Sequence, residues 1–164
     1  DGKNFEYDKV ILAASNYNEL FKDLITNEDA LDFIARTKPV KGDYLFKEIS
    51  HGIKPKSIAI GSHHLIFRNK SILIGSSSFN NNSIQLIDHQ ALRDIHQCIS
   101  SAVDFKLPKY EEFSAICGIR SKGRKRMPFW GEVAPNLFMI GGLYKNGFSF
   151  AFKAARDISN KIIN

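Results

Sequence analysis

The segment CGIRSKGRKRMPFWG, residues 117–131, concentrates positive charge directly after an apolar stretch. Five cations lie within seven positions: Arg120, Lys122, Arg124, Lys125 and Arg126. Arg120 follows Gly118 and Ile119, where a guanidinium could hold a carboxylate through two parallel hydrogen bonds. The other four cations could contact the phosphates of a nucleic acid. The competing interpretations are a structural ion pair for Arg120 and a solvated charged loop for the rest.

Two aromatic residues, Phe129 and Trp130, follow the cations in a Pro-Phe-Trp-Gly sequence that predicts a turn. Aromatic rings beside cations can stack on nucleic-acid bases. Large aromatic side chains more often pack into the protein itself. We therefore predict that this pair packs rather than binds.

A second segment, NLFMIGGLYKNG (residues 136–147), places glycines between a strand and a helix. The apolar residues 137–140 predict a strand, Gly141 and Gly142 follow it, and Gly147 opens a helix. Glycine lets a ligand approach the backbone closely, and a helix N-terminus carries about half a positive charge. With Lys145 nearby, this turn suits an anionic group, either a phosphate or the N1 and C2-oxygen edge of a reduced flavin. The alternative is a tight turn whose glycines only permit packing.

The remaining reactive side chains predict neither a metal site nor a nucleophilic site. His63 and His64 alternate faces on a predicted strand, and no carboxylate lies at ligand spacing. No metal is therefore expected. No Ser/His/Asp or Cys/His arrangement is recognisable. Cys117 lies in an apolar strand and is interpreted as a small buried hydrophobic residue.

The elements that would position these residues begin with an α/β pattern. Residues 9–14 form an apolar run typical of a strand buried on both faces of a parallel sheet. A helix is expected through residues 20–24. A second helix is expected to begin after the cap Asn27 and to end at Lys38-Pro39.

The middle of the chain follows a different pattern. Short β-rich runs from residue 40 to 79 are separated by Gly, Pro and Asn, with residues 68–70 as a hairpin turn. Residues 88–103 predict an amphipathic helix, and strands are expected at residues 112–119 and 136–140. The final helix, residues 147–163, has one apolar stripe: Phe148, Ala151, Phe152, Ala155, Ile158 and Ile162. This order predicts an α+β fold, in which a mixed or antiparallel sheet is inserted into an α/β layer.

The composition is that of a globular, moderately basic protein. The 164 residues are 43% hydrophobic and 24% charged, with a formal net charge of +6. These values argue against disorder and are compatible with nucleic-acid binding. Two cysteines without CxxC spacing favour a reducing, cytoplasmic compartment. The sequence has no apolar run near the roughly 20 residues of a membrane span and no signal peptide. It starts without Met, and we expect a fragment of a longer protein.

The segment from Gly118 onward resembles the C-terminal part of the D-amino-acid-oxidase-like flavoenzymes, which include glycine and sarcosine oxidases. That family has a strand bearing Gly-x-Arg, a loop ending in Pro-x-x-Gly, and a strand leading into a glycine-rich turn and a final helix. Here Pro128 and Gly131 supply the loop motif. YDKVILAASNYNELF (residues 7–21), TKPVKGDYLF (37–46) and SILIGSSSF (71–79) resemble further motifs of the family, in the family's order.

FAD is the cofactor that this resemblance implies. Arg120 would hold the substrate carboxylate. Residues 1–35 and 117–164 would form the flavin-binding lobe, and residues 36–116 the substrate-binding sheet. The flavin contacts implied are Ala13, Ala14, Gly118, Gly141, Gly142, Lys145, Asn146 and Gly147. The family's Gly-x-Gly-x-x-Gly motif, which holds the FAD pyrophosphate, is missing from this sequence. The FAD-binding segment that carries it is therefore an expected partner.

Within the family, residues 117–131 are most similar to the oxidase domains of bifunctional enzymes that make methylaminomethyl-thiouridine in tRNA. This similarity implies removal of a carboxymethyl group from the wobble uridine, by hydride transfer from the CH₂ beside the amine to flavin N5 and hydrolysis of the imine. The cations that would contact tRNA are Lys122, Arg124, Lys125 and Arg126. Two alternatives stay open: an oxidase of free amino acids of the glycine or sarcosine type, and a non-catalytic RNA-binding remnant of such an enzyme.

Overall fold

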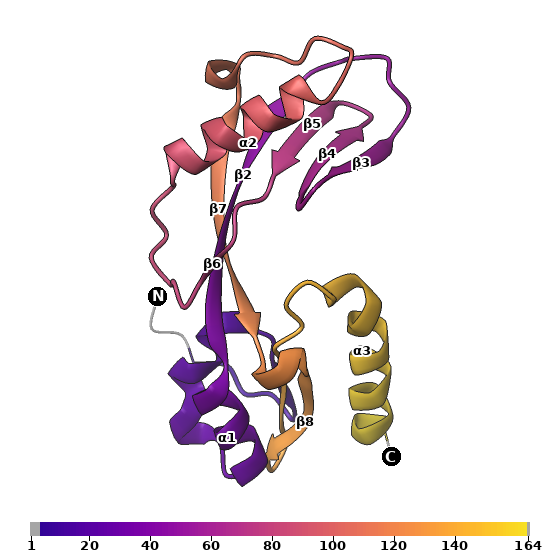
Figure 1. Ribbon diagram of the computed structural model, residues 1–164. Coiled ribbons are helices and arrows are strands. Elements are labelled where there is room, and N and C mark those ends of the chain that lie inside the picture. Colours follow the sequence, from indigo (N-terminus) through magenta and orange to yellow (C-terminus); the bar gives the residue numbers. More distant parts are fainter. Residues whose placement is uncertain (1–3, 164) are drawn as a thin grey trace. The chain divides into compact units, whose positions relative to one another are not determined.

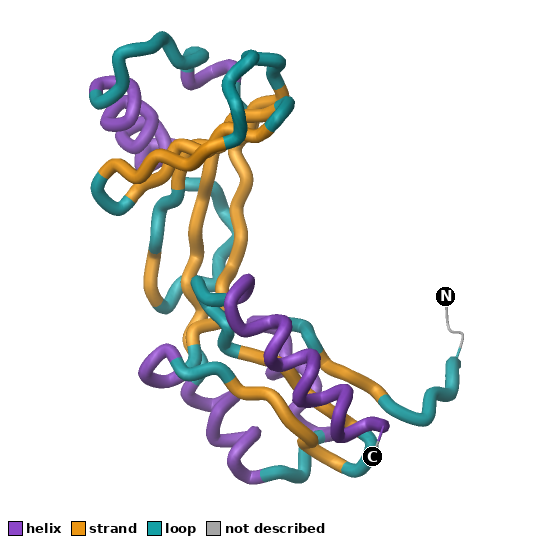
Figure 2. The backbone as a smooth tube through the Cα atoms, turned by 90° about the vertical axis from the view of Figure 1, so that its right-hand side faces the viewer, coloured by secondary structure: helices purple, strands orange, loops and turns teal. Residues whose placement is uncertain are grey.

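The computed structural model describes residues 4–163 and divides the chain into two compact units. Unit 1 combines the N-terminal segment up to Pro39 with the segment from Arg120 onward, and unit 2 is Val40–Ile119. Each unit contains helices and strands, which confirms the predicted α+β class (Figures 1 and 2). The sequence had placed the two boundaries at residues 35/36 and 116/117.

Unit 1 is built on a three-stranded sheet in the order β1-β9-β8. β1 (Val10–Leu12) runs parallel to β9 (Leu137–Gly141), and β8 (Phe129–Ala134) runs antiparallel to β9. The prediction of a turn at Phe129–Gly131 was wrong, because these residues pair with Met139–Gly141 and so begin a strand. β1 is an edge strand, so Val10 and Ile11 are exposed rather than buried on both faces as predicted.

Helices flank this sheet. A 3₁₀-helix, η1 (Ser15–Leu24), replaces the first predicted helix, and α1 (Glu28–Arg36) begins where expected, with Asn27 Oδ1 accepting a hydrogen bond from the Ala30 N–H at 2.9 Å. α3 (Gly147–Ile163) closes the chain. Of the apolar stripe predicted for α3, Ile158 is buried and Ile162 is half-buried. The other members, Phe148, Ala151, Phe152 and Ala155, are exposed, and Ala154, which lies outside the predicted stripe, is buried.

Unit 2 is an antiparallel sheet covered on one face by α2 (His89–Ser101). The strand order is β3-β4-β5-β2-β6, and β7 also pairs with β2. The strands are β2 (Lys38–Glu48), β3 (Lys56–Ile60), β4 (His63–Arg68), β5 (Ser71–Gly75), β6 (Phe79–Asn80) and β7 (Ser114–Lys122). The core between sheet and helix contains Leu45, Leu65, Phe67, Ile72, Ile74, Leu92, Ile95 and Ile99.

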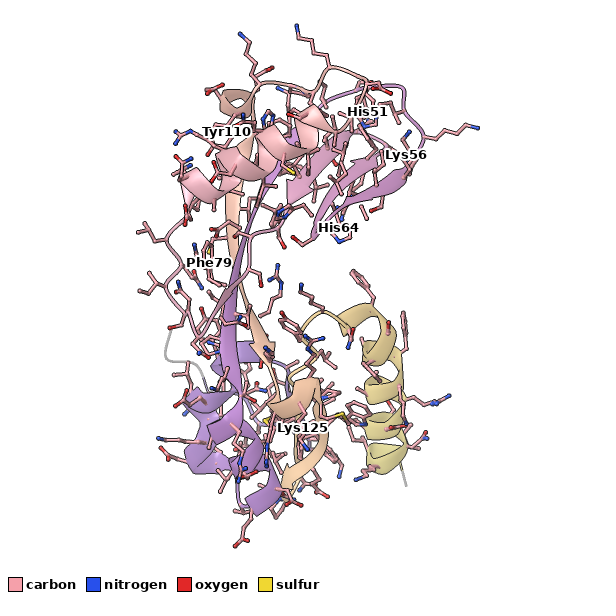
Figure 3. All side chains as sticks on the ribbon, viewed as in Figure 1. His51, Lys56, His64, Phe79, Tyr110 and Lys125 are labelled. Atoms are coloured by element: carbon pink, nitrogen blue, oxygen red, sulfur yellow. The ribbon has the colours of Figure 1, made fainter. Side chains whose placement is uncertain are left out.

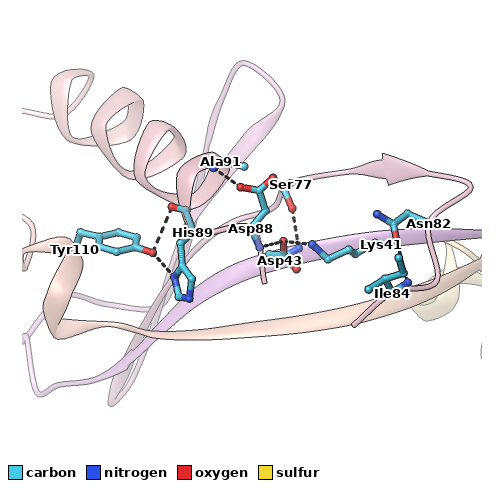
Figure 4. Close-up of polar contacts among 9 residues, drawn as sticks. All are labelled: Lys41, Asp43, Ser77, Asn82, Ile84, Asp88, His89, Ala91 and Tyr110. Carbon is cyan, nitrogen blue, oxygen red and sulfur yellow. Dashed lines mark hydrogen bonds and ion pairs between the residues drawn. The ribbon is translucent and has the colours of Figure 1, made fainter. Parts of the chain in front are cut away.

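A buried ion pair joins β2 to the start of α2. Lys41 Nζ lies 2.7 Å from Asp43 Oδ2, and both side chains are almost completely buried. Asp43 Oδ2 also accepts the Asp88 N–H at 3.1 Å, and Ser77 Oγ accepts the Asp43 N–H at 2.8 Å (Figure 4). Asp88 in turn caps α2 by accepting the Ala91 N–H. Asp43 therefore ties a strand, a loop and a helix end together, the loop through its backbone N–H and the helix end through its carboxylate.

Candidate active site

Of the residues predicted to lie beside a cofactor, Ala13, Ala14 and Gly141 meet at one edge of the unit 1 sheet, whereas Gly118 lies in unit 2. β1 and β9 are parallel, so their carboxyl ends are adjacent, and Ala13 and Gly141 lie at these ends. Asn18, which is buried, links the two ends: its Oδ1 accepts the Ala14 N–H at 3.0 Å, and its Nδ2 donates to the Ile140 carbonyl at 3.0 Å. In open α/β sheets, ligands bind outside the carboxyl ends of the strands.

Three glycines at this edge accommodate the ring of Phe33. A Cβ on Gly142 would lie 2.6 Å from Phe33 Cζ, and Cβ atoms on Gly141 and Gly123 would lie about as close to the same ring. Gly142 also has φ +69, a left-handed conformation that favours glycine. Packing against Phe33 therefore explains these glycines. The sequence offered no signal for this contact, because Phe33 is about one hundred residues away.

The arginine-bearing strand reaches the same turn. Lys122 at the end of β7 forms an isolated antiparallel bridge with Leu143. The Nζ atoms of Lys122 and Lys145 each lie 5.7 Å from the centre of the Tyr144 ring. Arg120 lies two residues before Lys122 and thus on the same face of β7. β7 therefore meets, through Lys122, the turn that carries Lys145, and Arg120 lies two residues before this contact.

The N-terminus of α3 follows this turn and is open. Asn146 accepts backbone hydrogen bonds from Ser149 and Phe150, and no acidic residue lies in the first helical turn. A Cβ on Gly147 would meet no atom within 4 Å. The unpaired N–H groups of a helix start, with Lys145 just before them, favour a negative charge.

The remaining cations form an exposed turn between β7 and β8. Arg124, Lys125 and Arg126 are all exposed, and Lys125 is labelled in Figure 3. Two hydrogen bonds shape the turn, from the Arg126 N–H to the Gly123 carbonyl and from the Met127 N–H to the Arg124 carbonyl. The cationic segment thus divides: three cations point to solvent, and Lys122 lies against Tyr144.

Phe129 and Trp130 pack inside unit 1. The Phe129 ring lies 5.5 Å from that of Phe33, and the Trp130 indole N–H donates to Asp157 Oδ2 on α3 at 3.0 Å. Lys153 Nζ lies 2.7 Å from the same oxygen. These two donors hold the pKa of Asp157 below its ordinary value, and Lys153 has the larger effect. The prediction that the aromatic pair packs is confirmed.

Unit 2 contributes a pocket of about 200 Å³ on the sheet. Its polar side chains are Tyr44, His64 and Ser76, and the remaining lining is Ile66, Leu73, Ile74 and Gly75. His64 is labelled in Figure 3. Gly75 and Ser76 belong to the SILIGSSSF motif, whereas sequence reasoning had assigned no role to Tyr44 or His64.

Cys117 lies beside the buried ion pair and is half-buried rather than buried as predicted. Burial and the adjacent Asp43 carboxylate together raise the pKa of its thiol. Burial alone would raise the pKa of Asp43 as well. The hydrogen bonds from Lys41 and from the Asp88 N–H outweigh that effect and lower it. The lowered pKa of Asp43 favours its ionised form, and the raised pKa of Cys117 favours the neutral thiol.

Comparison with models of known protein families assigns the chain to one family. Residues 1–160 match the model of the family DAO, described as FAD dependent oxidoreductase. The chain belongs to this family. No curated protein matches it.

Solved structures of the DAO type share the fold at low sequence identity. Glycine oxidase from Bacillus cereus superimposes with a TM-score of 0.71 at 18% identity, over 93% of this chain and 42% of that one. Glycine oxidase from Geobacillus kaustophilus has a TM-score of 0.65 at 17% identity, over 98% and 43%. Iminodiacetate oxidase from Chelativorans sp. superimposes with a TM-score of 0.65 at 16% identity, over 95% of this chain and 42% of that one. The chain thus spans less than half the length of these proteins.

FAD, the cofactor of the DAO family, is compatible with the open α3 N-terminus. Gly147 leaves space there, and both the helix end and Lys145 suit the electron-rich edge of a flavin ring. The sequence contains no Gly-x-Gly-x-x-Gly motif for the pyrophosphate.

Among the described residues, no helix is long and apolar enough to cross a membrane, and no group of three or more His, Cys, Asp and Glu could hold a metal ion.

Proposed function

We propose that this chain is part of an FAD-dependent oxidase that acts on the C–N bond of a carboxymethylamino group, carried by the wobble uridine of tRNA. The observation that carries the proposal is the Lys122–Leu143 bridge. It joins the strand bearing Arg120 to the glycine turn that leads into α3. This contact supports the assignment of the substrate carboxylate to Arg120 and of the flavin ring edge to the start of α3, because Arg120 and the start of α3 both belong to unit 1 and to connected segments.

Each of these groups has a separate task. Bound FAD supplies the two-electron acceptor. Arg120 binds and orients the substrate carboxylate through charge-assisted hydrogen bonds. Lys145 and the N–H groups at the start of α3 stabilise negative charge on the ring edge. Ala13 and Ala14, at the end of β1, have small side chains that would leave room for the ring.

Two further observations support the carboxymethylamine and tRNA parts of the proposal. One of the similar structures is an iminodiacetate oxidase, and iminodiacetate is itself an N-carboxymethyl amine. The exposed Arg124, Lys125 and Arg126 form a compact cationic turn suited to phosphate contacts.

The test of the carboxylate role is Arg120→Met in the intact, flavin-loaded enzyme. Loss of a bidentate charged contact costs about 3 kcal/mol, so KM should rise on the order of 100-fold. The flavin absorbance spectrum should not change. The control is Arg68→Met, an exposed arginine of unit 2. An unchanged KM in the Arg120 variant would remove this role.

The tRNA role is tested by the triple variant Arg124→Gln, Lys125→Gln, Arg126→Gln. We expect kcat/KM for tRNA to fall steeply and to lose most of its salt dependence, because phosphate contacts release counterions. Activity on a small carboxymethyl amine should be retained. If the small substrate is oxidised well and tRNA is not oxidised by the parent enzyme, the free amino-acid oxidase is the correct alternative. A colourless chain that binds tRNA without oxidising it would instead identify the RNA-binding remnant.

A further inference from the structure

Unit 2 contains a second, larger groove of about 450 Å³ that shares no lining residue with the Tyr44–His64–Ser76 pocket. One wall is the segment that follows β2 and includes His51. The other wall is the segment that follows α2 and includes Phe105, Lys106 and Lys109. Figure 3 shows His51 and Lys56 at this end of the unit. Nothing proposed above uses this groove.

Aromatic rings from both walls pack on Phe67. The His51 ring meets the Phe67 ring edge-on, with centres 5.3 Å apart, and Phe67 lies 5.7 Å from Phe105. Phe67 is 1% exposed and belongs to the core, whereas Phe105 is 37% exposed. Phe105 therefore presents part of its ring to any molecule in the groove.

Both walls are held in place by polar contacts. His51 Nδ1 accepts the Ile53 N–H at 3.0 Å, so the proton is on Nε2, which faces the Ser71 carbonyl at 3.4 Å. On the other wall, His96 Nε2 lies 2.9 Å from the Pro108 carbonyl. A groove with fixed walls loses little conformational entropy when it binds a ligand.

The charge left over in the groove is positive. Glu112 is the acidic residue of the lining, and its two oxygens accept hydrogen bonds from the Lys109 N–H at 2.7 Å and from Lys47 Nζ at 3.2 Å. The hydrogen bond from the Lys109 backbone N–H has the largest effect, and together with that from Lys47 it lowers the pKa of Glu112. The Lys47 ammonium balances the negative charge of Glu112. Within residues 4–163, neither Lys106 nor Lys109 forms a salt bridge through its side chain.

We propose that this groove binds a nucleotide of single-stranded RNA, with its base against Phe105 and its phosphates at Lys106 and Lys109. An aromatic platform with cations along its rim is the arrangement used for unpaired nucleotides. Two further cations, Lys54 and Lys56, follow the His51 wall, and Lys56 Nζ lies 5.8 Å from the Phe67 ring. Cations that line one wall and cations that follow the other in sequence match a phosphate chain longer than one nucleotide. The inference rests on the RNA part of the proposed function and adds a second RNA contact to it.

The test is an NMR titration of the ¹⁵N-labelled 164-residue chain with a short uridine-rich RNA, with UMP and with inorganic phosphate. We expect RNA to shift the amide resonances of residues 49–53 and 105–112. UMP should shift the same amides at much higher concentration, and phosphate should affect only Lys106 and Lys109.

Three variants make the test specific. The double variant Lys106→Gln, Lys109→Gln should weaken RNA binding at least about tenfold and reduce the salt slope by about two. Phe105→Leu keeps the apolar volume but removes the ring, and it should weaken binding by a similar factor. The matched control is Lys22→Gln, Lys161→Gln, which removes two exposed lysines of unit 1 and should change affinity less than about twofold.

Four results would overturn the inference. An equal loss in the control shows that binding is diffuse, and UMP binding as tightly as RNA shows a site for a free nucleotide. RNA shifts confined to Arg124–Arg126 remove the groove but leave the tRNA substrate standing. Absence of shifts with all three probes also removes the groove. Activity on tRNA, measured separately in the flavin-loaded enzyme, then remains the test of the oxidase proposal.

Discussion

At the scale of single residues, the best-defined chemistry in unit 2 is the Lys41–Asp43 pair and the thiol beside it. Two opposite charges are buried together, and the backbone N–H of Asp88 supplies a further donor. Buried pairs of this kind tolerate removal of both charges better than removal of one. This asymmetry gives two predictions.

Asp43→Ala should lower the free energy of unfolding by about 3–5 kcal/mol, because it leaves Lys41 buried without its partner. The double variant Lys41→Met, Asp43→Leu should recover most of that loss. Urea unfolding followed by circular dichroism measures both. A double variant no more stable than Asp43→Ala would contradict the explanation.

The same pair predicts a pH dependence. The folded pKa of Asp43 is lowered, so its contribution is present above its unfolded pKa of about 4 and is lost as the pH falls below that value. The unfolding free energy of the parent chain should therefore fall more steeply between about pH 5 and about pH 3 than that of Asp43→Asn. Parallel curves would show that Asp43 is not the titrating group.

Thiol reactivity provides a further prediction. Cys98 is exposed on α2, whereas burial and Asp43 raise the pKa of Cys117. Because the thiolate is the reacting form, Cys98 should react with iodoacetamide at least about tenfold faster near pH 8. Asp43→Asn should speed the reaction of Cys117 and leave that of Cys98 unchanged. Mass spectrometry of the alkylated peptides gives both rates.

At the scale of elements, two glycines in the turn between β9 and α3 differ in how strongly the structure requires glycine at their positions. Gly142 has φ +69 and packs against Phe33, while Gly147 starts a helix next to open space. Sequence spacing alone does not distinguish the two. The structure does, and the distinction is measurable.

Gly142→Ala should destabilise the chain by about 1–3 kcal/mol through backbone strain and the clash with Phe33. Gly147→Ala should leave stability unchanged or raise it by up to about 1 kcal/mol, because alanine favours the helix. Thermal unfolding compares them. In a Phe33→Leu background the cost of Gly142→Ala should shrink. If Gly142→Ala destabilises the chain equally in that background, the left-handed φ of residue 142 accounts for the whole effect.

At the scale of the whole molecule, unit 1 exposes an unusual amount of apolar surface. On α3, Phe148 is 97% and Phe152 is 81% exposed. Val10 and Ile11 of β1 are exposed as well. Phe148 and Phe152 are four residues apart on one helix and so form an exposed apolar pair.

The chain should therefore bind the hydrophobic dye ANS in its native state. The double variant Phe148→Ser, Phe152→Ser should reduce that fluorescence by more than half while circular dichroism stays unchanged. The control on the same helix is Lys153→Ser, Arg156→Ser, which should not reduce it. Equal dye binding by the parent chain and the phenylalanine variant would show that these rings are covered in solution.

Local sequence determined most of the element types and the family pattern, with η1 and β8 as the exceptions. Asn27 and Asp88 cap their helices where their side chains can reach the first free N–H groups, and the alternation in residues 40–79 produces antiparallel pairs. These features depend on neighbours within a few positions. The same is true of the Gly-x-Arg strand end and the glycine turn.

The tertiary structure alone decided which of these residues meet. The Phe33 contact with Gly142, the Asn18 link between strand ends and the burial of Lys41 with Asp43 all depend on distant segments. β8 was missed for the same reason, because Phe129–Gly131 is extended through pairing with β9. The outward position of Phe148 depends on how α3 docks through Ala154 and Ile158. Periodicity reveals that a helix has an apolar stripe, but the packing partner selects which stripe is buried.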